Sequence, residues 1–544
     1  MDKLGQKLVD KGLLSRRDLE RAQAAARKAF KPLSSVLSEE GYLPEEDLLR
    51  TQAELYGMEF VDLRDVSVEE KAVKALSPKL VSHYGIMPVE FRGGVLVIAV
   101  SDPLDTAPSQ DIQTNLGVKV DRVLARRNDI QEALRAHYGV GADTVERILS
   151  ETDREEEDAA VEDSQDLEKM AEDASVVKLV NQLMLEAIKD RATDIHFEVE
   201  PQGLAVRRRI DGVLYETKVP ENIRLLYPAI VSRIKLMSGL NIVERRLPQD
   251  GRAGVNIGHK RYDLRVSAVP AMRGEDIVVR ILPATMTFEL EQLGFSGEHR
   301  KLLEEMLSEA HGIIFVTGPT GSGKSTTLYA CLSRLNTRER KIITIEEPVE
   351  YELAGITQTQ VNPKIGLSFA RSLRSMLRHD PDVMMVGEVR DAETARIAVQ
   401  TAMTGHLVLS TLHTNDAAGG AVRLMDMGVE PYLIASTVKI FTAQRLVRVL
   451  CGCKESYRFE GKTLYRPKGC RKCRNSGYLG RVAISEFLPV RPEIRELILN
   501  KSSAADIRKK ADELGMKSLR ADGREKVEAG ITTAEEIMRV TSGE

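Results

Sequence analysis

The chain has 544 residues, 29% of them charged, and its formal net charge at pH 7 is −4. This length exceeds what a single hydrophobic core can organise, so we expect three or four domains. The balanced charge and the 4% aromatic content argue against nucleic acid as a partner. No apolar run reaches the roughly 18 to 20 residues that span a bilayer, and no signal peptide is evident, which favours a cytoplasmic protein with a peripheral membrane role.

An internal repeat occupies the first sixty residues. Each copy predicts a helix, a glycine stop and a second helix. Two copies are too few for a solenoid, so we expect a compact helical module over residues 1–58. The repeated positions are Leu4, Leu8, Gly12, Leu14, Asp18, Leu19 and Gln23, which recur as Leu33, Leu37, Gly41, Leu43, Asp47, Leu48 and Gln52.

Three further domains follow from pattern changes along the chain. Residues 59–140 alternate short strands with helical patterns, which predicts a small α/β domain. An acidic stretch then predicts a flexible linker over 141–173, or else a solvated charged helix. Residues 174–285 open with an amphipathic helix and continue in alternating strands, which predicts an α+β domain. Unbroken apolar strands alternate with long helices over 290–544, which predicts a parallel sheet covered on both faces.

The strongest chemical signal is GPTGSGKST, which follows a buried apolar strand and precedes a helix. It fits the pattern G-x-x-x-x-G-K-[ST], in which glycines let backbone N–H groups curl around phosphate oxygens. Lys324 would reach the β- and γ-phosphates, and the Ser325 hydroxyl would ligate Mg²⁺. The candidate ATP-binding residues are Gly318, Pro319, Thr320, Gly321, Ser322, Gly323, Lys324, Ser325 and Thr326.

Two more apolar strands end in carboxylates, Glu346 in the first and Glu388 in the second. Because ligands bind at the carboxyl ends of parallel strands, we expect both acids to approach the phosphate site. We assign Glu388 to Mg²⁺ through its outer shell and Glu346 to the attacking water as general base. A further strand is bracketed by His406 and His413, a pair that could sense or stabilise the γ-phosphate.

Four of the five cysteines lie between residues 451 and 473. Clustered as CxC and CxxC in a chain without an export signal, they favour metal ligation over disulfides. Four thiolates can hold Zn²⁺ tetrahedrally, so we predict a structural metal-binding subdomain over about residues 449–480, with Gly452 allowing the tight CxC bend. The four predicted ligands are Cys451, Cys453, Cys470 and Cys473.

In this order GPTGSGKST, IEEPVE, LRHDPDVMMVGEVRDAET and TGHLVLSTLHTNDA resemble the Walker A, aspartate-box, Walker B-like and histidine-box segments of secretion and pilus assembly ATPases. DIHFE, RRRIDG, LPQDGR, DLRVS and GYLGR extend the resemblance over the chain after the acidic stretch. It implies a RecA-like P-loop ATPase domain over 290–544, a PAS-like α+β domain over 174–285, and a homohexamer with nucleotide held between these domains.

The resemblance also assigns roles to arginines. It implies that Arg265 and Arg280 reach the γ-phosphate, where guanidinium groups stabilise transferred charge. Arg374, Arg378 and Arg390 would supply further charged contacts. One departure is that Glu347 stands where the aspartate box has aspartate, which keeps the charge and therefore the expected activity.

The N-terminal repeat resembles a module that binds cyclic di-GMP in some pilus and secretion ATPases. Four positions depart from that module's pattern, and they favour a role in docking a membrane partner over cyclic di-GMP binding. The departing residues are Lys3, Ala26, Ser34 and Leu55.

The leading functional hypothesis is an ATP-hydrolysing motor of type II secretion at the inner membrane, with a membrane platform protein and cytoplasmic docking proteins as partners. A type IV pilus extension ATPase is the alternative. A helicase or DNA-translocating ATPase would need a basic, aromatic nucleic-acid track. A nucleotide-gated scaffold would require the carboxylates after the P-loop to be inert.

Overall fold

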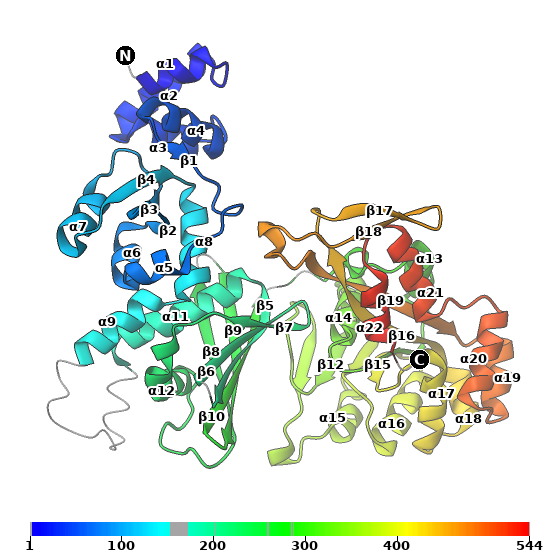
Figure 1. Cartoon of the computed structure of the whole chain (residues 1–544). Coiled ribbons are helices and arrows are strands. Elements are labelled where there is room, and N and C mark those ends of the chain that lie inside the picture. Colours follow the sequence, from blue (N-terminus) through cyan, green and yellow to red (C-terminus); the bar gives the residue numbers. More distant parts are fainter. Residues whose placement is uncertain are drawn as a thin grey trace. The chain divides into compact units, whose positions relative to one another are not determined.

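The computed structural model describes residues 3–152, 172–201, 203–257, 260–283, 286 and 288–542 (Figure 1). The chain divides into two compact units, Met1–Leu282 and Pro283–Glu544. None of the described helices has both the length and the apolar character that crossing a membrane requires.

The N-terminal repeat folds as two helix pairs, as its sequence predicts. Gly12 and Gly41 occupy equivalent turns with the same φ of 70°, a conformation that favours glycine. Ser15 begins the second helix by accepting a hydrogen bond from the Asp18 N–H at 3.1 Å. Equivalent leucines of both copies share one core. The helices are α1 (Lys3–Asp10), α2 (Arg16–Ala29), α3 (Leu33–Glu39) and α4 (Glu45–Tyr56).

A four-stranded sheet with order β1-β4-β3-β2 follows the repeat, and only β2 and β3 pair antiparallel. Apolar clusters lie on both sides of this sheet, which forms the predicted α/β region. Its strands are β1 (Glu59–Phe60), β2 (Met87–Arg92), β3 (Val95–Val100) and β4 (Val120–Leu124). Its helices are α5 (Glu70–Ala75), α6 (Pro78–Tyr84), α7 (Ala107–Leu116) and α8 (Arg127–Tyr138).

The predicted linker does not begin at residue 141, because residues from there onward form helix α9 (Ala142–Thr152). Val145 and Ile148 are buried in one core with helix α11 (Ala174–Lys189), because two apolar residues three positions apart share a helix face. The Glu146 carboxylate accepts a hydrogen bond from the Lys79 N–H at 2.7 Å. Residues 153–171 of the predicted linker lie outside the described residues.

The predicted α+β domain contains a six-stranded sheet with order β7-β6-β5-β10-β9-β8, whose described pairings are antiparallel. Helices α11 and α12 (Tyr227–Met237) contribute to its core. The strands are β5 (Ala192–Glu200), β6 (Gly203–Ile210), β7 (Val213–Thr217), β8 (Gln249–Ile257), β9 (Lys260–Ala271) and β10 (Gly274–Pro283).

The second unit is built on a seven-stranded sheet with order β13-β12-β14-β15-β11-β16-β19. All neighbours pair parallel except β16 and β19. Separate apolar cores cover the two faces of the sheet, as the apolar strands predict. The strands are β11 (Gly312–Thr317), β12 (Ile342–Glu346), β13 (Thr357–Gln360), β14 (Val383–Val386), β15 (Leu407–Leu412), β16 (Val438–Leu450) and β19 (Tyr478–Pro489).

Helices enclose this sheet and complete the unit. Helices α13 (Gly297–Leu307) and α14 (Lys324–Leu335) contribute to one core. The other core includes α15 (Phe369–Met376), α16 (Ala392–Met403), α17 (Ala417–Asp426), α18 (Pro431–Thr437), α19 (Pro492–Leu499) and α20 (Ala504–Glu513). The ribbon β17 (Glu455–Phe459) and β18 (Lys462–Arg466) and the helices α21 (Leu519–Glu528) and α22 (Ala534–Thr541) complete the fold.

The packing of α9 gives a stability prediction. We expect Val145→Asp to destabilise the protein by about 3 kcal/mol or more, because it places an unpaired carboxylate in the core shared with α11. Urea unfolding followed by circular dichroism measures this change. Asp143→Asn, on the same helix but partly exposed, is the control and should shift stability by less than about 0.5 kcal/mol. Equal stability of both variants would mean that α9 behaves as a linker.

Candidate active site and metal site

The P-loop connects β11 to α14 in a shape that requires its glycines. Gly318, Gly321 and Gly323 have φ values of 144°, 79° and 92°. A Cβ on Gly318 would lie 2.6 Å from the Gln444 carbonyl oxygen, and one on Gly323 would lie 2.7 Å from the Gln444 side-chain nitrogen. Gly323 is the N-cap residue of α14 and has no side chain to cap the helix. The N–H groups of the first turn are therefore available to an anion.

Lys324 is held inside this loop. Its Nζ donates hydrogen bonds to the carbonyl oxygens of Gly318 at 2.7 Å and Pro319 at 3.1 Å. Burial lowers the pKa of Lys324 to about 8, with the charge of Glu388 raising it and that of Arg445 lowering it. Ser325 and Thr326 lie exposed on the first turn of α14, and Pro319, Thr320 and Gly321 lie in the loop before it.

Glu388 lies at the same edge of the sheet as the P-loop. Strands β11, β15 and β14 are parallel neighbours, so the segments that follow them emerge together. The Glu388 carboxylate pairs with Arg390 at 2.6 Å, and its other oxygen lies 3.2 Å from His413 Nε2. The structure therefore brings together three of the predicted site residues, Lys324, Glu388 and His413.

Glu346 lies farther from the P-loop than we expected for a general base. It ends β12, three strands from β11 and about 14 Å away laterally, whereas β14 is two strands and about 10 Å away. Its buried carboxylate accepts hydrogen bonds from the Thr344 hydroxyl at 2.6 Å, the Gln358 amide at 3.0 Å and the Tyr329 hydroxyl. A carboxylate has about four acceptor sites, so only one is left for a water molecule.

His406 was predicted to lie near the γ-phosphate, but the structure does not bring it to the P-loop of the same chain. His406 precedes β15, and its carbonyl oxygen accepts from the Gly312 N–H at 3.1 Å, at the start of β11. The six residues of β11 separate this point from the P-loop by about 20 Å. The His406 ring instead has its Nδ1 3.0 Å from the Thr401 carbonyl oxygen.

The predicted arginines divide between the two units. Arg265 lies on β9 and Arg280 on β10, where the Arg280 Nε donates to Asp194 at 3.0 Å. Their contact with a γ-phosphate stays a prediction. In the second unit, Arg374 pairs with Glu393 and Arg378 donates to the Arg374 carbonyl oxygen at 3.2 Å.

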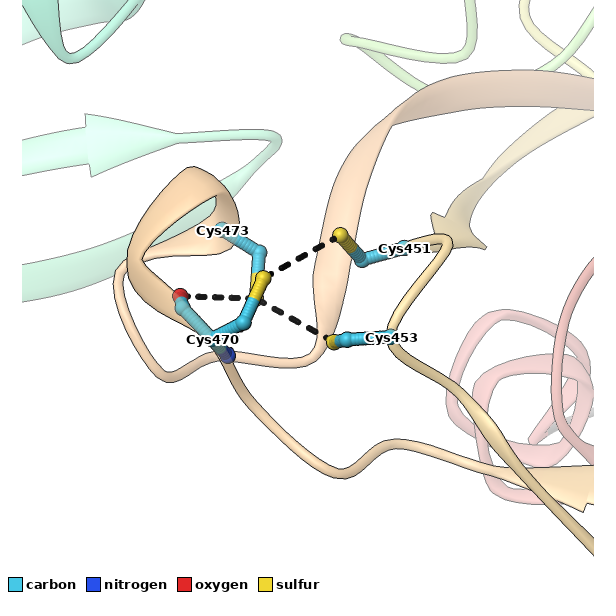
Figure 2. Close-up of side chains that lie close together, drawn as sticks. All are labelled: Cys451, Cys453, Cys470 and Cys473. Atoms are coloured by element: carbon cyan, nitrogen blue, oxygen red, sulfur yellow. Dashed lines mark hydrogen bonds between the residues drawn. The ribbon is translucent and has the colours of Figure 1, made fainter. Parts of the chain in front are cut away.

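The four clustered cysteines form a compact sulfur site (Figure 2). Their sulfur atoms all lie within 4.8 Å of one another, with Cys451 to Cys470 and Cys453 to Cys473 at 3.8 Å. A tetrahedron with Zn–S bonds of about 2.3 Å has S–S edges of about 3.8 Å. The N–H groups of Cys470 and Gly477 donate to the Cys473 sulfur at 3.1 and 3.3 Å, the support that a thiolate ligand needs. The site thus fits Zn²⁺.

The CxC pair reaches the cluster without special help from Gly452. The φ of Gly452 is not positive, and a Cβ there would meet nothing within 4 Å. The bend is instead closed by the Lys454 N–H, which donates to the Cys451 carbonyl oxygen at 2.9 Å. The prediction that glycine makes this bend possible is therefore wrong.

Several residues of the site were missed in the sequence. Tyr329 holds Glu346, while Gln444 and Arg445 of β16 lie against the P-loop and the loop after β15. The available signal was a polar pair inside the apolar run FTAQRLV, since a buried strand rarely carries an amide and a guanidinium without partners.

Two protein-family models match this chain. The family model described as "Type II/IV secretion system protein" matches residues 169–539, which include the P-loop, both strand-end acids and the cysteine cluster. A model of the MshEN domain matches residues 56–144, which cover the α/β region and begin near the end of the repeat.

Individual relatives cover nearly the whole chain. The type IV pilus assembly ATPase PilB of Myxococcus xanthus is 40% identical over 561 residues, 99% of each chain. A type II secretion system protein E of Xanthomonas campestris is 41% identical over 556 residues, 98% of this chain and 97% of the relative. The solved structure of the Legionella pneumophila ATPase DotB matches 67% of this chain and 95% of its own, with 25% identity and a TM-score of 0.51. The predicted multidomain α/β architecture with a P-loop ATPase domain is confirmed.

The lowered pKa of Lys324 predicts a pH-dependent affinity. Only the ammonium form pairs with phosphate, so ADP affinity should fall about tenfold between pH 7 and pH 9, across the pKa of about 8. Equilibrium titration with fluorescent ADP measures this. Arg445→Met removes a charge that lowers this pKa and should move the transition to higher pH, while Arg458→Met, on the exposed ribbon, should leave it in place. A constant affinity across this range would contradict the prediction.

Proposed function

Since the chain belongs to the type II/IV secretion system protein family, we propose that it is the ATP-hydrolysing motor of type II secretion, driving pseudopilus assembly at the cytoplasmic face of an inner membrane. The observation that carries the proposal is the convergence of the P-loop, Glu388 and His413 at one sheet edge. The motor works as a homohexamer with a membrane platform protein and cytoplasmic docking proteins.

The alternative is a motor for type IV pilus extension. It is supported by the PilB relative, which matches as much of this chain as the secretion relative and at nearly the same identity. Genes for pseudopilins beside this one would favour secretion, and genes for pilins would favour the pilus.

The chemistry of the proposal rests on the chain's own residues. Lys324 and the free N–H groups of α14 bind the phosphates of ATP. The Ser325 hydroxyl would hold Mg²⁺, which would supply positive charge to the phosphate oxygens. The charge of Glu388 acts on Lys324, and we assign Glu388 to orient the attacking water, with His413 beside it.

Of the other predicted roles, only that of Glu346 changes. Glu346 already accepts three hydrogen bonds, which favours a structural role in anchoring Tyr329 and β12 over that of general base. We retain Arg265 and Arg280 as donors to the γ-phosphate on the family resemblance alone. Residues 1–58 serve to dock a membrane partner, with cyclic di-GMP as the alternative ligand.

Zn²⁺ at the four cysteines has a structural role in this proposal. The cluster stands where β16 ends, and the Leu450 N–H donates to the Ile531 carbonyl oxygen at 2.7 Å. Lys454 Nζ donates to the Gly530 carbonyl oxygen at 2.6 Å. The metal would therefore hold the β17–β18 excursion against the segment between α21 and α22.

Turnover measurements test the catalytic assignment. We expect Lys324→Ala and Glu388→Gln each to lower kcat about 100-fold or more. The first variant removes the ammonium group that binds the phosphates, and the second removes the carboxylate that orients the attacking water. A coupled assay of phosphate release measures kcat. Glu513→Gln, an exposed acid on α20, is the control and should retain full activity. Unchanged turnover in both site variants would exclude a motor, and stimulation by DNA would favour a translocase.

Metal analysis tests the cysteine site. Protein purified without chelator should contain about one Zn²⁺ per chain, since the four sulfurs form one tetrahedral site. Cys453→Ser should lose most of this zinc and lower the thermal midpoint, whereas Cys331→Ala, a change at the buried cysteine of α14, should keep it. Mass spectrometry of the metal content gives the stoichiometry. Zinc-free wild-type protein would overturn the assignment.

A further inference from the structure

One buried side chain of β16 contacts both segments that flank Lys324. The Gln444 side-chain nitrogen donates to the Ser322 carbonyl oxygen at 3.0 Å, within the P-loop. Its side-chain oxygen accepts from the Thr327 hydroxyl at 2.7 Å, in the first turn of α14. Gln444 is only 1% exposed, so water cannot replace either hydrogen bond.

The first of these hydrogen bonds sets the direction of a peptide group. In a planar trans peptide the C=O of one residue and the N–H of the next point in opposite directions. When Gln444 binds the Ser322 carbonyl, it therefore turns the Gly323 N–H away from β16. A phosphate-binding loop needs its N–H groups turned inward in this manner before the anion arrives.

The contacts on the glycines show how closely β16 approaches the loop. The Gln444 main chain would clash with a Cβ at Gly318, and its amide with a Cβ at Gly323. Gln444 therefore packs closely against the P-loop at both of its ends, Gly318 and Gly323.

The next residue along the strand extends the contact to the loop that carries His413. Arg445 is buried, and its guanidinium donates to the Asn415 carbonyl oxygen at 2.8 Å and to the Gln444 carbonyl oxygen at 3.1 Å. Strand β16 thus holds the P-loop through Gln444 and the loop after β15 through Arg445.

We propose that Gln444 is a positioning residue that preorganises the P-loop for nucleotide phosphates, while Arg445 fixes the loop after β15 relative to it. This inference rests on the proposed function in one respect, namely that the P-loop binds ATP or ADP. It assigns Gln444 no contact with the nucleotide itself.

The test compares two variants of β16. Gln444→Met keeps the length of the side chain and removes both hydrogen bonds. Thr442→Val is the matched control, because Thr442 lies two residues earlier on the same face of the strand and its buried hydroxyl has no hydrogen-bond partner among the described residues. Titration of the full chain with fluorescent ADP gives the affinity, steady-state assays separate KM from kcat, and calorimetry gives the thermal midpoint.

We expect Gln444→Met to weaken ADP binding about tenfold and to raise KM for ATP by a similar factor, with Thr442→Val within about twofold of wild type. A lower thermal midpoint with unchanged ADP affinity would overturn the proposal, because it would reduce Gln444 to a role in stability. Should Gln444→Met fail to fold, Thr327→Val removes the second hydrogen bond from the other side. It should weaken ADP binding, while Thr327→Ser, which keeps the hydroxyl, should restore it, and equal affinity of both would overturn the proposal.

These outcomes separate this inference from the proposed function. If wild-type protein binds ADP but does not hydrolyse ATP, the motor proposal fails, and a weaker affinity of Gln444→Met still supports the positioning role. If wild-type protein hydrolyses ATP and Gln444→Met binds ADP equally well, the positioning role fails alone. If wild-type protein binds no nucleotide, both are overturned.

Discussion

The parallel pairing of β11 with β15 on one side and β16 on the other is the constraint on which the site depends. Parallel strands deliver the segments after their carboxyl ends to one edge of the sheet, so the P-loop, His413 and Glu388 meet although they are far apart in the sequence. Strand β16 differs, because it continues past this edge as a longer strand, and its middle supplies Gln444 and Arg445 beside the loops.

Burial at this edge has two effects on Lys324. It removes water from the ammonium group, which lowers the pKa to about 8, and it also strengthens every charge interaction that the group makes. Arg445 adds a second positive charge nearby, and Glu388 offsets part of it. Placing the positive charges of Lys324 and Arg445 near each other destabilises the free protein. The same placement becomes favourable when a phosphate binds, because the anion stabilises both cations together.

The sequence predicted four strands of the second unit, β11, β12, β14 and β15, because each is a mostly apolar run next to a characteristic motif. It placed Lys324, Glu388 and His413 correctly at one edge. It misplaced His406 because both histidines flank the same strand, and a strand of six residues separates its two ends by about 20 Å. The role expected for Glu346 required knowledge of the strand order, which puts β12 farther from β11 than β14. The pairing of Gln444 with Ser322 joins residues 122 positions apart and leaves no local pattern. The linker boundary failed for a simpler reason, since the acidic composition hid the apolar face of α9.

The cysteine cluster lies at the end of the strand that carries Gln444 and Arg445. Gln444 lies in β16 and Cys451 follows the end of that strand directly. β16 is paired along most of its length with β19, which begins after Cys473, so the cluster joins the ends of two paired strands. A metal held there would keep these ends together and limit sliding of β16 against β19. Because a one-residue shift in strand register would turn Gln444 to the opposite face of the sheet, any constraint on this register also protects the geometry of the P-loop.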